Sequence, residues 1–129
     1  MEEKRENTEA QATIDRLEIK CSNMKDIVRY LSGGNQQKVL FGKWMLRKPR
    51  IVLVNEPTRG VDVGTKSEIY KILEELCREG CGVLMISSEL PEVLALSDRV
   101  YVLCNGKLTG EFARGELSSE ILLESAIGR

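Results

Sequence analysis

Three short polar segments of this sequence carry residue types that could bind an anion and activate a water molecule. The first, Leu31–Gln37, reads Leu-Ser-Gly-Gly-Asn-Gln-Gln and stands just before a helical pattern. Its two glycines let a ligand approach the backbone, and a helix start presents unpaired N–H groups with about half a unit of positive charge. The Ser32 hydroxyl adds a donor, so the segment suits a phosphate. On its own, Ser-Gly-Gly before a helix is more often an ordinary loop and cap.

The second polar segment follows the apolar run Ile51–Val54. Asn55 and Glu56 come directly after it, and there the glutamate could orient or deprotonate a water while the amide could support a metal-bound water. The alternative is a strand that simply ends in a polar loop. The tight turn Arg59–Asp62 comes next, and Asp62 could equally cap the following helix.

A strand–helix–strand unit is predicted to bring these segments together. Ile51–Val54 and Val83–Ile86 are short, continuous apolar runs, typical of parallel strands that are covered on both faces. Between them, Thr65–Glu79 has apolar residues at helical spacing. The third polar segment, Ser87–Glu89, follows the second strand. Because the carboxyl ends of parallel strands share one edge of a sheet, these polar segments should converge there.

The remaining elements are predicted from caps, turns and spacing, and the alternation of strands and helices gives an α/β class. Within residues 1–20 we expect a charged helix with one thin apolar stripe, and within 21–30 a short helix. The other predicted features are a capping box of Thr65 and Glu68 with Gly80 after the helix end, a helix over Asn35–Leu46, a short helix capped by Ser88 with Pro91 in its first turn, strands Val100–Leu103 and Leu108–Phe112 joined at Asn105-Gly106, and a last helix from the cap Ser118 through Ile127.

Composition excludes several classes of function. Lys and Arg number 19 against 20 Asp and Glu, so a nucleic-acid partner is not expected. The sequence has no histidine, which excludes Ser-His-Asp triads and His-ligated zinc within these residues. The four cysteines lack Cys-x-x-Cys spacing and are expected to be reduced and mostly buried. No apolar run is long enough for a membrane span and no secretory pattern follows Met1, so a cytosolic protein is expected.

The order of these segments resembles that of the ATP-binding subunits of ABC transporters. Leu31–Gln37 is similar to the signature motif, and Ile51–Thr58 is similar to a Walker B strand with its following glutamate. Arg59–Asp62 resembles the D-loop and Ile86–Glu89 the H-loop, with order and spacing that agree over about residues 25–112. The residues of these motifs are most similar to those in the second cassette of the tandem ATPase subunit of ribose-, galactose- and xylose-type sugar importers.

The resemblance implies part of a P-loop NTPase core that binds ATP between two cassettes. In the family, the Walker A loop of one cassette holds the phosphates while the signature of the other caps the γ-phosphate. Catalysis at such a site is chiefly positioning and charge stabilisation. The residues that would contact ATP in this way are Leu31, Ser32, Gly33, Gly34, Asn35 and Gln36, and the D-loop residues that would communicate across the dimer are Gly60, Val61 and Asp62.

The resemblance also assigns catalytic and metal positions. Glu56 would polarise the attacking water. Ser88 stands where the H-loop usually has a histidine, and second cassettes of this sugar branch often have a serine at that position. Asn55 stands at the Walker B aspartate that holds the water shell of Mg²⁺. A neutral amide lacks the charge but still accepts a hydrogen bond. ATP and Mg²⁺ are therefore expected only with a partner segment that carries Walker A.

The sequence departs from the family pattern in having no Walker A string, Gly-x-x-x-x-Gly-Lys-Ser/Thr, within its 129 residues. Residues 1–48 are then expected to be part of the helical subdomain, and 49–129 the C-terminal part of the ATPase core. The strand that precedes Walker A in the family is missing, so the sheet should lack a central member. The chain should be marginally stable or associate through unpaired strand edges, and it is predicted not to hydrolyse ATP alone.

The function that the resemblance implies is that of an ATPase fragment of a bacterial sugar importer. Its partners would be an N-terminal cassette half or a second cassette, transmembrane permease subunits and, indirectly, a periplasmic or lipoprotein sugar-binding protein, at the inner face of the cell membrane. One alternative is a catalytically inactive interaction module that completes a partner cassette, and another is a purine-nucleoside importer. A DNA-repair ATPase with a similar signature is disfavoured, because coiled-coil heptads and excess positive charge are absent from the sequence.

Overall fold

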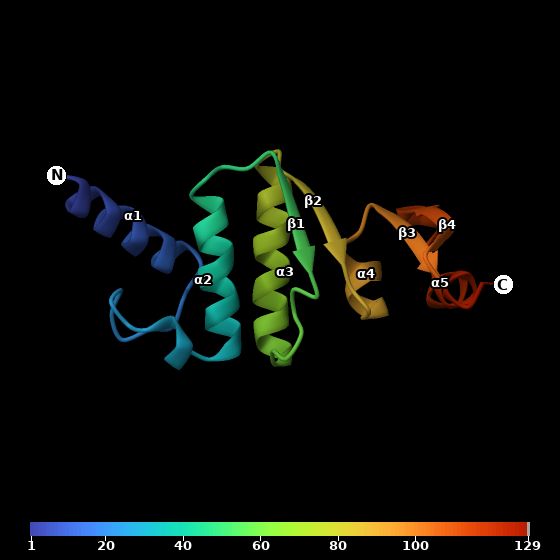
Figure 1. Ribbon diagram of the computed structural model, residues 1–129, viewed down its shortest axis with the longest axis horizontal. Helices are drawn as coiled ribbons and strands as arrows, with labels where there is room; N and C mark the ends of the chain where they lie inside the picture. Colours follow the sequence, from blue (N-terminus) through green and yellow to red (C-terminus); the bar gives the residue numbers. More distant parts are fainter. Residues whose placement is uncertain (129) are drawn as a thin grey trace. The chain divides into compact units, whose positions relative to one another are not determined.

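A computed structural model describes residues 1–128, an α/β chain with two small sheets (Figure 1). The chain divides into two compact units, Met1–Ile86 and the residues from Ser87 onward. The first unit contains α1 (Glu2–Arg16), the 3₁₀ turn η1 (Val28–Tyr30), α2 (Gly33–Met45), β1 (Ile51–Asn55), α3 (Val63–Arg78) and β2 (Gly82–Ile86). The second contains α4 (Leu90–Leu96), β3 (Arg99–Cys104), β4 (Lys107–Ala113), the 3₁₀ turn η2 (Arg114–Glu116) and α5 (Ser119–Ala126).

The predicted strand–helix–strand unit is confirmed. β1 and β2 pair in parallel, from Ile51 opposite Gly82 to Asn55 opposite Ile86. Gly80, with a φ of +88°, follows the end of α3 in the left-handed conformation, as its position predicted. α3 packs its apolar stripe inward, and the side chains that it buries are Ile69, Ile72, Leu73 and Leu76.

α3 begins earlier than the capping box predicted. Asp62, rather than Thr65, is the N-cap, and its carboxylate accepts a hydrogen bond from the Thr65 N–H at 2.9 Å. The prediction of Thr65 as the cap is wrong because an acidic residue three positions earlier satisfies the free N–H groups and extends the helix. α2 likewise begins at Gly33, before the predicted Asn35, because Ser32 caps it.

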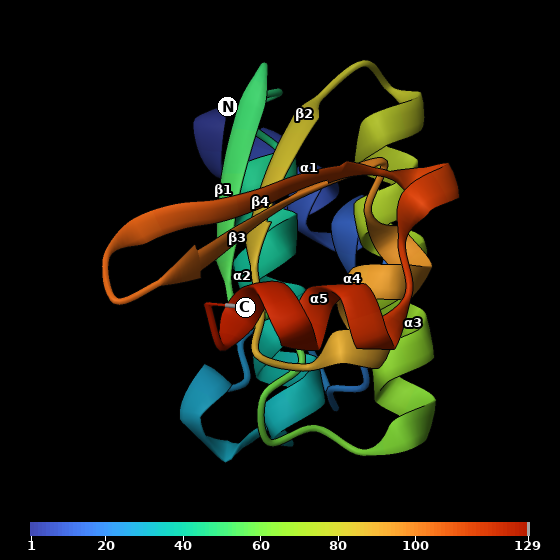
Figure 2. The same cartoon turned by 90° about the vertical axis from the view of Figure 1, so that its right-hand side faces the viewer.

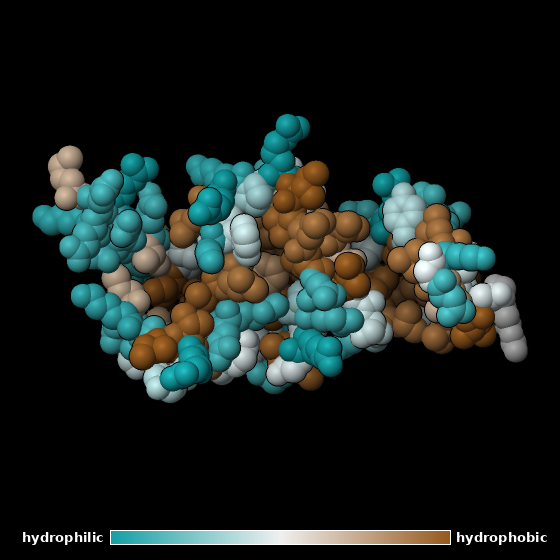
Figure 3. All heavy atoms as spheres, viewed as in Figure 1, coloured by the Kyte–Doolittle hydropathy of each residue, from teal (hydrophilic) through white to brown (hydrophobic). Residues whose placement is uncertain are grey.

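One face of the β1–β2 sheet is uncovered, which corrects the prediction that both faces are buried. On this bare face the exposed fractions are 70% at Ile51, 73% at Leu53, 55% at Leu84 and 61% at Ile86. Figure 3 shows apolar side chains gathered over β1 and β2. Val54 on the opposite face is buried. The prediction was wrong because an apolar run shows that both faces of a strand can be covered, and not that this chain supplies both layers.

β3 and β4 form an antiparallel hairpin whose turn is the predicted Asn105-Gly106 pair. The two residues have φ values of +50° and +75°, as a two-residue turn of this kind requires. α5 packs on the hairpin (Figure 2), where the Thr109 hydroxyl donates to the Ser125 carbonyl at 2.8 Å. The predicted cap of α5 is confirmed, because Ser118 accepts from the Ile121 N–H. The strands form two separate two-stranded sheets.

The start of α4 differs from the prediction that Ser88 caps it. Glu89 is the N-cap, without a side-chain cap bond. The residue that closes this turn is Ser87, whose hydroxyl oxygen accepts from the Glu89 N–H at 3.1 Å and whose hydroxyl donates to the Glu92 carboxylate at 2.5 Å. Glu92 is only 1% exposed. The prediction was wrong because a buried carboxylate requires hydrogen-bond donors, and Ser87 lies within reach.

α1 is a charged helix, as predicted, and beyond its end Leu17 and Ile19 are buried. All four cysteines are free, as expected, but only Cys81 is buried, and Cys77 is exposed. The prediction of mostly buried thiols is therefore wrong, since the buried stripe of α3 stops at Leu76. Among residues 1–128, none of the helices has both the length and the apolar character needed to cross a membrane.

Candidate functional site

The signature turn, Leu31–Gln37, forms the N-terminus of α2. Ser32 is the N-cap, and its hydroxyl oxygen accepts hydrogen bonds from the Asn35 N–H at 3.4 Å and from the Asn35 side-chain amide at 2.8 Å. The Asn35 amide oxygen accepts in turn from the Lys20 N–H at 2.9 Å. Because Ser32 accepts in both of these bonds, its own hydroxyl hydrogen can serve a ligand. Ser32 and Gly33 are exposed, so the turn is open to an anion.

The two glycines of the signature turn face residues that follow Glu56. A Cβ atom placed on Gly33 would lie 3.8 Å from the Gly60 carbonyl oxygen, which is an ordinary contact. A Cβ atom on Gly34 would lie 2.2 Å from the Thr65 methyl carbon, a separation that forces something to shift. Gly34 is thus buried against α3, where a larger residue would have to displace the Thr65 side chain, while the Gly33 backbone keeps an open side.

Glu56 lies in a constrained turn directly after β1. Its φ is +47°, a left-handed conformation that is uncommon for residues other than glycine and is enriched at functional sites. Its N–H donates to the Ile86 carbonyl at 2.8 Å, and its own carbonyl accepts from the Arg59 N–H at 3.1 Å. The Gln37 side-chain amide donates to the carbonyl of buried Pro57 at 2.9 Å. This bond brings the signature turn to the Glu56 loop, within one unit.

Local hydrogen bonds hold the other residues of the signature turn and the D-loop segment. The Gln36 side-chain amide donates to the Leu31 carbonyl at 2.8 Å, which closes the turn from within. Gly60 has a φ of +75°, and the Val61 N–H donates to the Thr58 carbonyl at 3.3 Å. The segment after Glu56 is therefore a tight turn, as predicted, and it leads directly into the cap of α3.

Asp62 uses both carboxylate oxygens as the cap of α3. Oδ1 accepts from the Thr65 N–H and Oδ2 accepts from the Thr65 hydroxyl, each at 2.9 Å. These hydrogen bonds, first the one from the backbone, hold the pKa of Asp62 below its ordinary value of 3.8. Of the two roles considered for Asp62, the helix cap is confirmed, and communication across a dimer stays a prediction.

Lys38 is a buried cation one turn after Gly34. It is 2% exposed, its Nζ donates to the Glu18 carbonyl at 3.1 Å, and it forms an ion pair with the Glu68 carboxylate at 2.5 Å. These contacts join α2 to α3 and to the segment after α1, so they help to fix the direction of the signature turn. No pattern in the sequence pointed to Lys38, because lysine is the residue type expected on the solvent side of a helix.

Asn55 ends β1 on the bare face, opposite Ile86, and is exposed. Within residues 1–128, no three His, Cys, Asp or Glu side chains gather as a metal site would need. Since Mg²⁺ is bound by carboxylates together with phosphate oxygens, the amide of Asn55 and the carboxylate of Glu56 do not make a magnesium site by themselves. Ser88 is exposed in the second unit, and its catalytic role stays a prediction.

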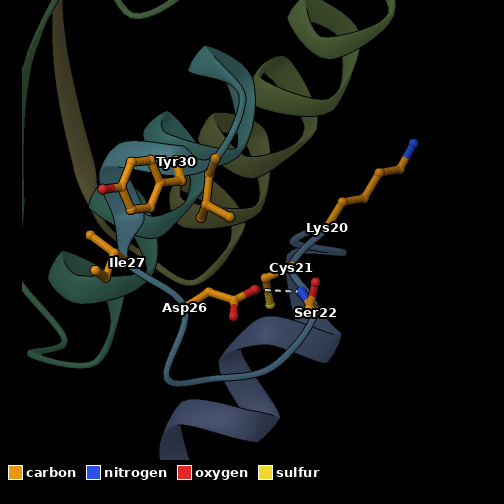
Figure 4. Close-up of a pocket in the computed structure, with 7 residues that line it drawn as sticks. Lys20, Cys21, Ser22, Asp26, Ile27 and Tyr30 are labelled. Carbon is orange, nitrogen blue, oxygen red and sulfur yellow. Dashed lines mark hydrogen bonds between the residues drawn. The ribbon is translucent and has the colours of Figure 1, made fainter.

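A hollow of about 520 Å³ lies beside the start of the signature turn (Figure 4). Its one carboxylate, Asp26, accepts from the Ser22 N–H at 2.5 Å and from the Asn23 N–H at 3.2 Å, so it holds its own loop. Apart from Leu31, no predicted site residue lines the hollow. The lining residues are Lys20, Cys21, Ser22, Asp26, Ile27, Tyr30 and Leu31.

Known proteins similar to this chain are sugar import ATP-binding proteins. The xylose import ATP-binding protein XylG of Geobacillus kaustophilus is 48% identical over 120 residues, which cover 93% of this chain and 24% of that protein. The arabinose import ATP-binding protein AraG of Burkholderia pseudomallei is 46% identical over 98% of this chain and 25% of its own length. The ribose import ATP-binding protein RbsA of Clostridium perfringens is 43% identical over 99% of this chain and 26% of its own length. No family model matches the chain.

Solved structures of similar fold are ATP-binding cassettes. MJ1267, an ATP-binding cassette of an ABC transporter, aligns with a TM-score of 0.77 and 28% identity over 94% of this chain and 49% of that chain. The dimeric cassette MJ0796, 22% identical with a TM-score of 0.72, has the same fold over 83% of this chain. The chain spans about a quarter of the length of the curated relatives it matches. Over nearly its whole length the chain matches the C-terminal part of sugar import ATP-binding proteins at 43–48% identity, and it has the fold of an ABC-transporter cassette.

Proposed function

We propose that this chain supplies the signature, Walker B, D-loop and H-loop segments of an ATP-hydrolysing subunit of a sugar importer. The observation that carries the proposal is the hydrogen bond from Gln37 to Pro57, which holds the exposed signature turn beside the Glu56 loop. Residues 1–48 would belong to the helical subdomain and 49–129 to the ATPase core. The subunit would lie at the inner face of the cell membrane, bound to permease subunits and supplied by a sugar-binding protein.

In this role the Walker A loop of an opposing cassette holds most of the ATP molecule, and the signature turn contacts the γ-phosphate. Ser32 would donate its hydroxyl hydrogen and Gly33 its N–H, at the positive end of α2. Asn35 and Gln36 would keep the turn in shape, because their side chains already bond to Ser32 and Leu31. The turn would thus meet the ligand with groups that need no rearrangement.

Glu56 would orient the attacking water from a loop that is fixed to the end of β2. When bound, Mg²⁺ would neutralise charge on the phosphate oxygens, with ligands that come mainly from the triphosphate. Asn55 would contact its water shell, and Ser88 would be a second catalytic position. The neutral amide of Asn55 favours a second candidate function, in which the chain is a catalytically inactive module that lends its signature turn to a partner cassette.

The bare face suggests which partner the proposed function requires. It carries four exposed apolar side chains, and Asn55 lies at its end. Exposed apolar patches of this kind usually mark an interaction surface. We assign the face to the cassette half that contains Walker A, since the solved cassette MJ1267 is about twice as long as the part that this chain matches. A strand paired at the edge of the sheet, followed by a helix packed on this face, would bring a phosphate loop to Asn55 and Glu56.

The test mixes the purified chain with the Walker A half of the second cassette of the xylose relative. Size-exclusion chromatography measures the complex, and phosphate release measures Mg²⁺-dependent ATP hydrolysis. We expect a complex that hydrolyses ATP, whereas the chain alone does not. Glu56→Gln should keep the complex and lower hydrolysis at least about 100-fold. Leu53→Asn on the bare face should weaken the complex, whereas Leu123→Asn, at a leucine that is 52% exposed in α5, should not.

Each outcome distinguishes the candidates. A complex without hydrolysis would support the inactive module. Failure to form a complex, or equal effects of the Leu53 and Leu123 changes, would contradict the assignment of the bare face. Saturable, Mg²⁺-dependent hydrolysis by the chain alone would show that it needs no partner segment.

A further inference from the structure

Thr65, in the first turn of α3, contacts both the Asp62 carboxylate and the signature turn. Its N–H donates to Oδ1 of Asp62 and its hydroxyl donates to Oδ2, each at 2.9 Å. Threonine is branched at Cβ, so its side chain has few favourable conformations. The bond from the hydroxyl selects one of them. Asp62 therefore fixes the direction in which the Thr65 methyl group points.

That methyl group lies against Gly34. An ideal Cβ position on Gly34 is 2.2 Å from Cγ2, 3.0 Å from Oγ1 and 3.1 Å from Cβ of Thr65. Both branches of the Thr65 side chain thus occupy the space that a larger residue at position 34 would need. Because packed interiors contain few voids, a rotation of Thr65 would press on or release the first turn of α2.

We infer that Thr65 is a positioning residue that couples the Asp62 carboxylate to the signature turn. Asp62 orients Thr65, and Thr65 sets where Gly34 and the first turn of α2 can lie. A partner that draws the Asp62 carboxylate away would loosen the turn that touches the phosphate. This consequence for ATP hydrolysis rests on the proposed function, whereas the coupling itself requires no ATP.

Neighbouring contacts confine the effect to the first turn of α2. One turn farther along the helix, the ion pair between buried Lys38 and partly exposed Glu68 holds α2 to α3. The bond from Gln37 to Pro57 holds it to the Glu56 loop. A change at Thr65 should therefore move the segment before Gln37 without displacing the rest of the helix.

The experiment measures hydrogen exchange of backbone amides by NMR in the full chain. The reporters are the Asn35 and Gln36 N–H groups, which bond to the side chain and carbonyl of Ser32. Asp62→Ala should accelerate their exchange at least about threefold, although neither amide donates its hydrogen bond to Asp62. When Thr65 is already alanine, the same change at Asp62 should alter their exchange by less than about 1.5-fold.

A matched control and a milder variant keep the experiment decisive. Thr8→Val removes a hydroxyl that bonds to the Lys4 carbonyl in exposed α1, and it should leave the reporters unchanged. If Asp62→Ala accelerates hydrogen exchange at every amide of the chain, the same comparison is made with Asp62→Asn instead. The asparagine keeps an acceptor oxygen and is therefore the milder change. Acceleration confined to α3 would overturn the inference and leave Asp62 as a cap alone. Equal acceleration with and without the Thr65 side chain would also overturn it.

Hydrolysis by the complex with the Walker A half is the second readout. Thr65→Ala should lower kcat several-fold, on the order of 3- to 10-fold, with little change in KM, since most of the ATP contacts belong to the partner. A wild-type complex that hydrolyses no ATP would count against the proposed function and leave the exchange result standing. A normal kcat in Thr65→Ala, together with Asn35 and Gln36 exchange rates that Asp62→Ala leaves unchanged, would contradict the inference and leave the proposed function standing.

Discussion

Replacing Gly34 with alanine should destabilise the chain, although alanine usually favours a helix. The added Cβ would lie 2.2 Å from Thr65 Cγ2, and Thr65 cannot turn away without losing its hydroxyl bond to Asp62. Forcing one carbon into a filled site costs about 1–3 kcal/mol, and the better helix propensity of alanine returns at most about 1 kcal/mol. The expected net loss in the free energy of unfolding is about 1–2 kcal/mol.

The adjacent glycine provides a matched control. A Cβ on Gly33 would meet only the Gly60 carbonyl oxygen, at 3.8 Å, so Gly33→Ala should be neutral or stabilise the chain by up to about 1 kcal/mol. The two variants should thus differ by about 2 kcal/mol, a factor of about 30 in the ratio of folded to unfolded chain. Urea unfolding followed by the fluorescence of Trp44, the single tryptophan, reports on α2 itself.

A double variant tests the stated cause. Thr65→Ala removes both branches and leaves a Cβ 3.1 Å from the new methyl, so Gly34→Ala should cost about half as much in that background. Equal free energies of unfolding for Gly33→Ala and Gly34→Ala would refute the reasoning. A cost that persists in full when Thr65 is shortened would place the strain elsewhere.

Three further changes should have measurable effects on stability. The stability that ionised Asp62 contributes is present above its ordinary pKa of 3.8 and is lost as pH falls through its lower pKa in the folded chain, so Asp62→Asn should destabilise at about pH 6 and lose its effect near pH 2 in urea titrations. Lys38→Met should cost about 1–3 kcal/mol by urea unfolding because it removes a buried cation that bonds to the Glu68 carboxylate and the Glu18 carbonyl, whereas Arg78→Met, at an exposed pair, should cost less than about 0.5 kcal/mol. Ser87→Ala removes a donor from the buried Glu92 carboxylate and should lower the free energy of unfolding by about 1–3 kcal/mol in thermal melts.

Features that depend on local preferences could be predicted from the sequence. The turn at Asn105-Gly106, the cap at Ser118 and the helix end at Gly80 each follow from the conformations that those residue types favour. The convergence of the signature turn with the Glu56 loop was also expected, because both border the same strand–helix–strand unit. The hydrogen bond from Gln37 to Pro57 confirms it.

Features that packing decides could not be predicted in this way. The contact between Gly34 and Thr65 depends on how closely α2 approaches α3, and no residue spacing encodes that distance. Lys38 is buried because acceptors from two other elements reach it, and a helical pattern alone places lysine in solvent. The wrong cap at Ser88 has the same origin, since the burial of Glu92 depends on tertiary structure.

The bare face sets the strength of the association that the proposed function requires. Fully burying one such side chain contributes about 1.5–3 kcal/mol, and the four side chains of this face are already partly covered, with exposed fractions of 55–73%. Covering the part of each that is still exposed would therefore contribute about 4–8 kcal/mol in total. Association costs about 4–15 kcal/mol in lost freedom of the partners, which offsets most of that gain. Apolar contact with the Walker A half would then give only a weak complex. The proposed function therefore requires further binding energy from strand pairing and from an ATP molecule that contacts both the Walker A segment and the loop of Asn55 and Glu56.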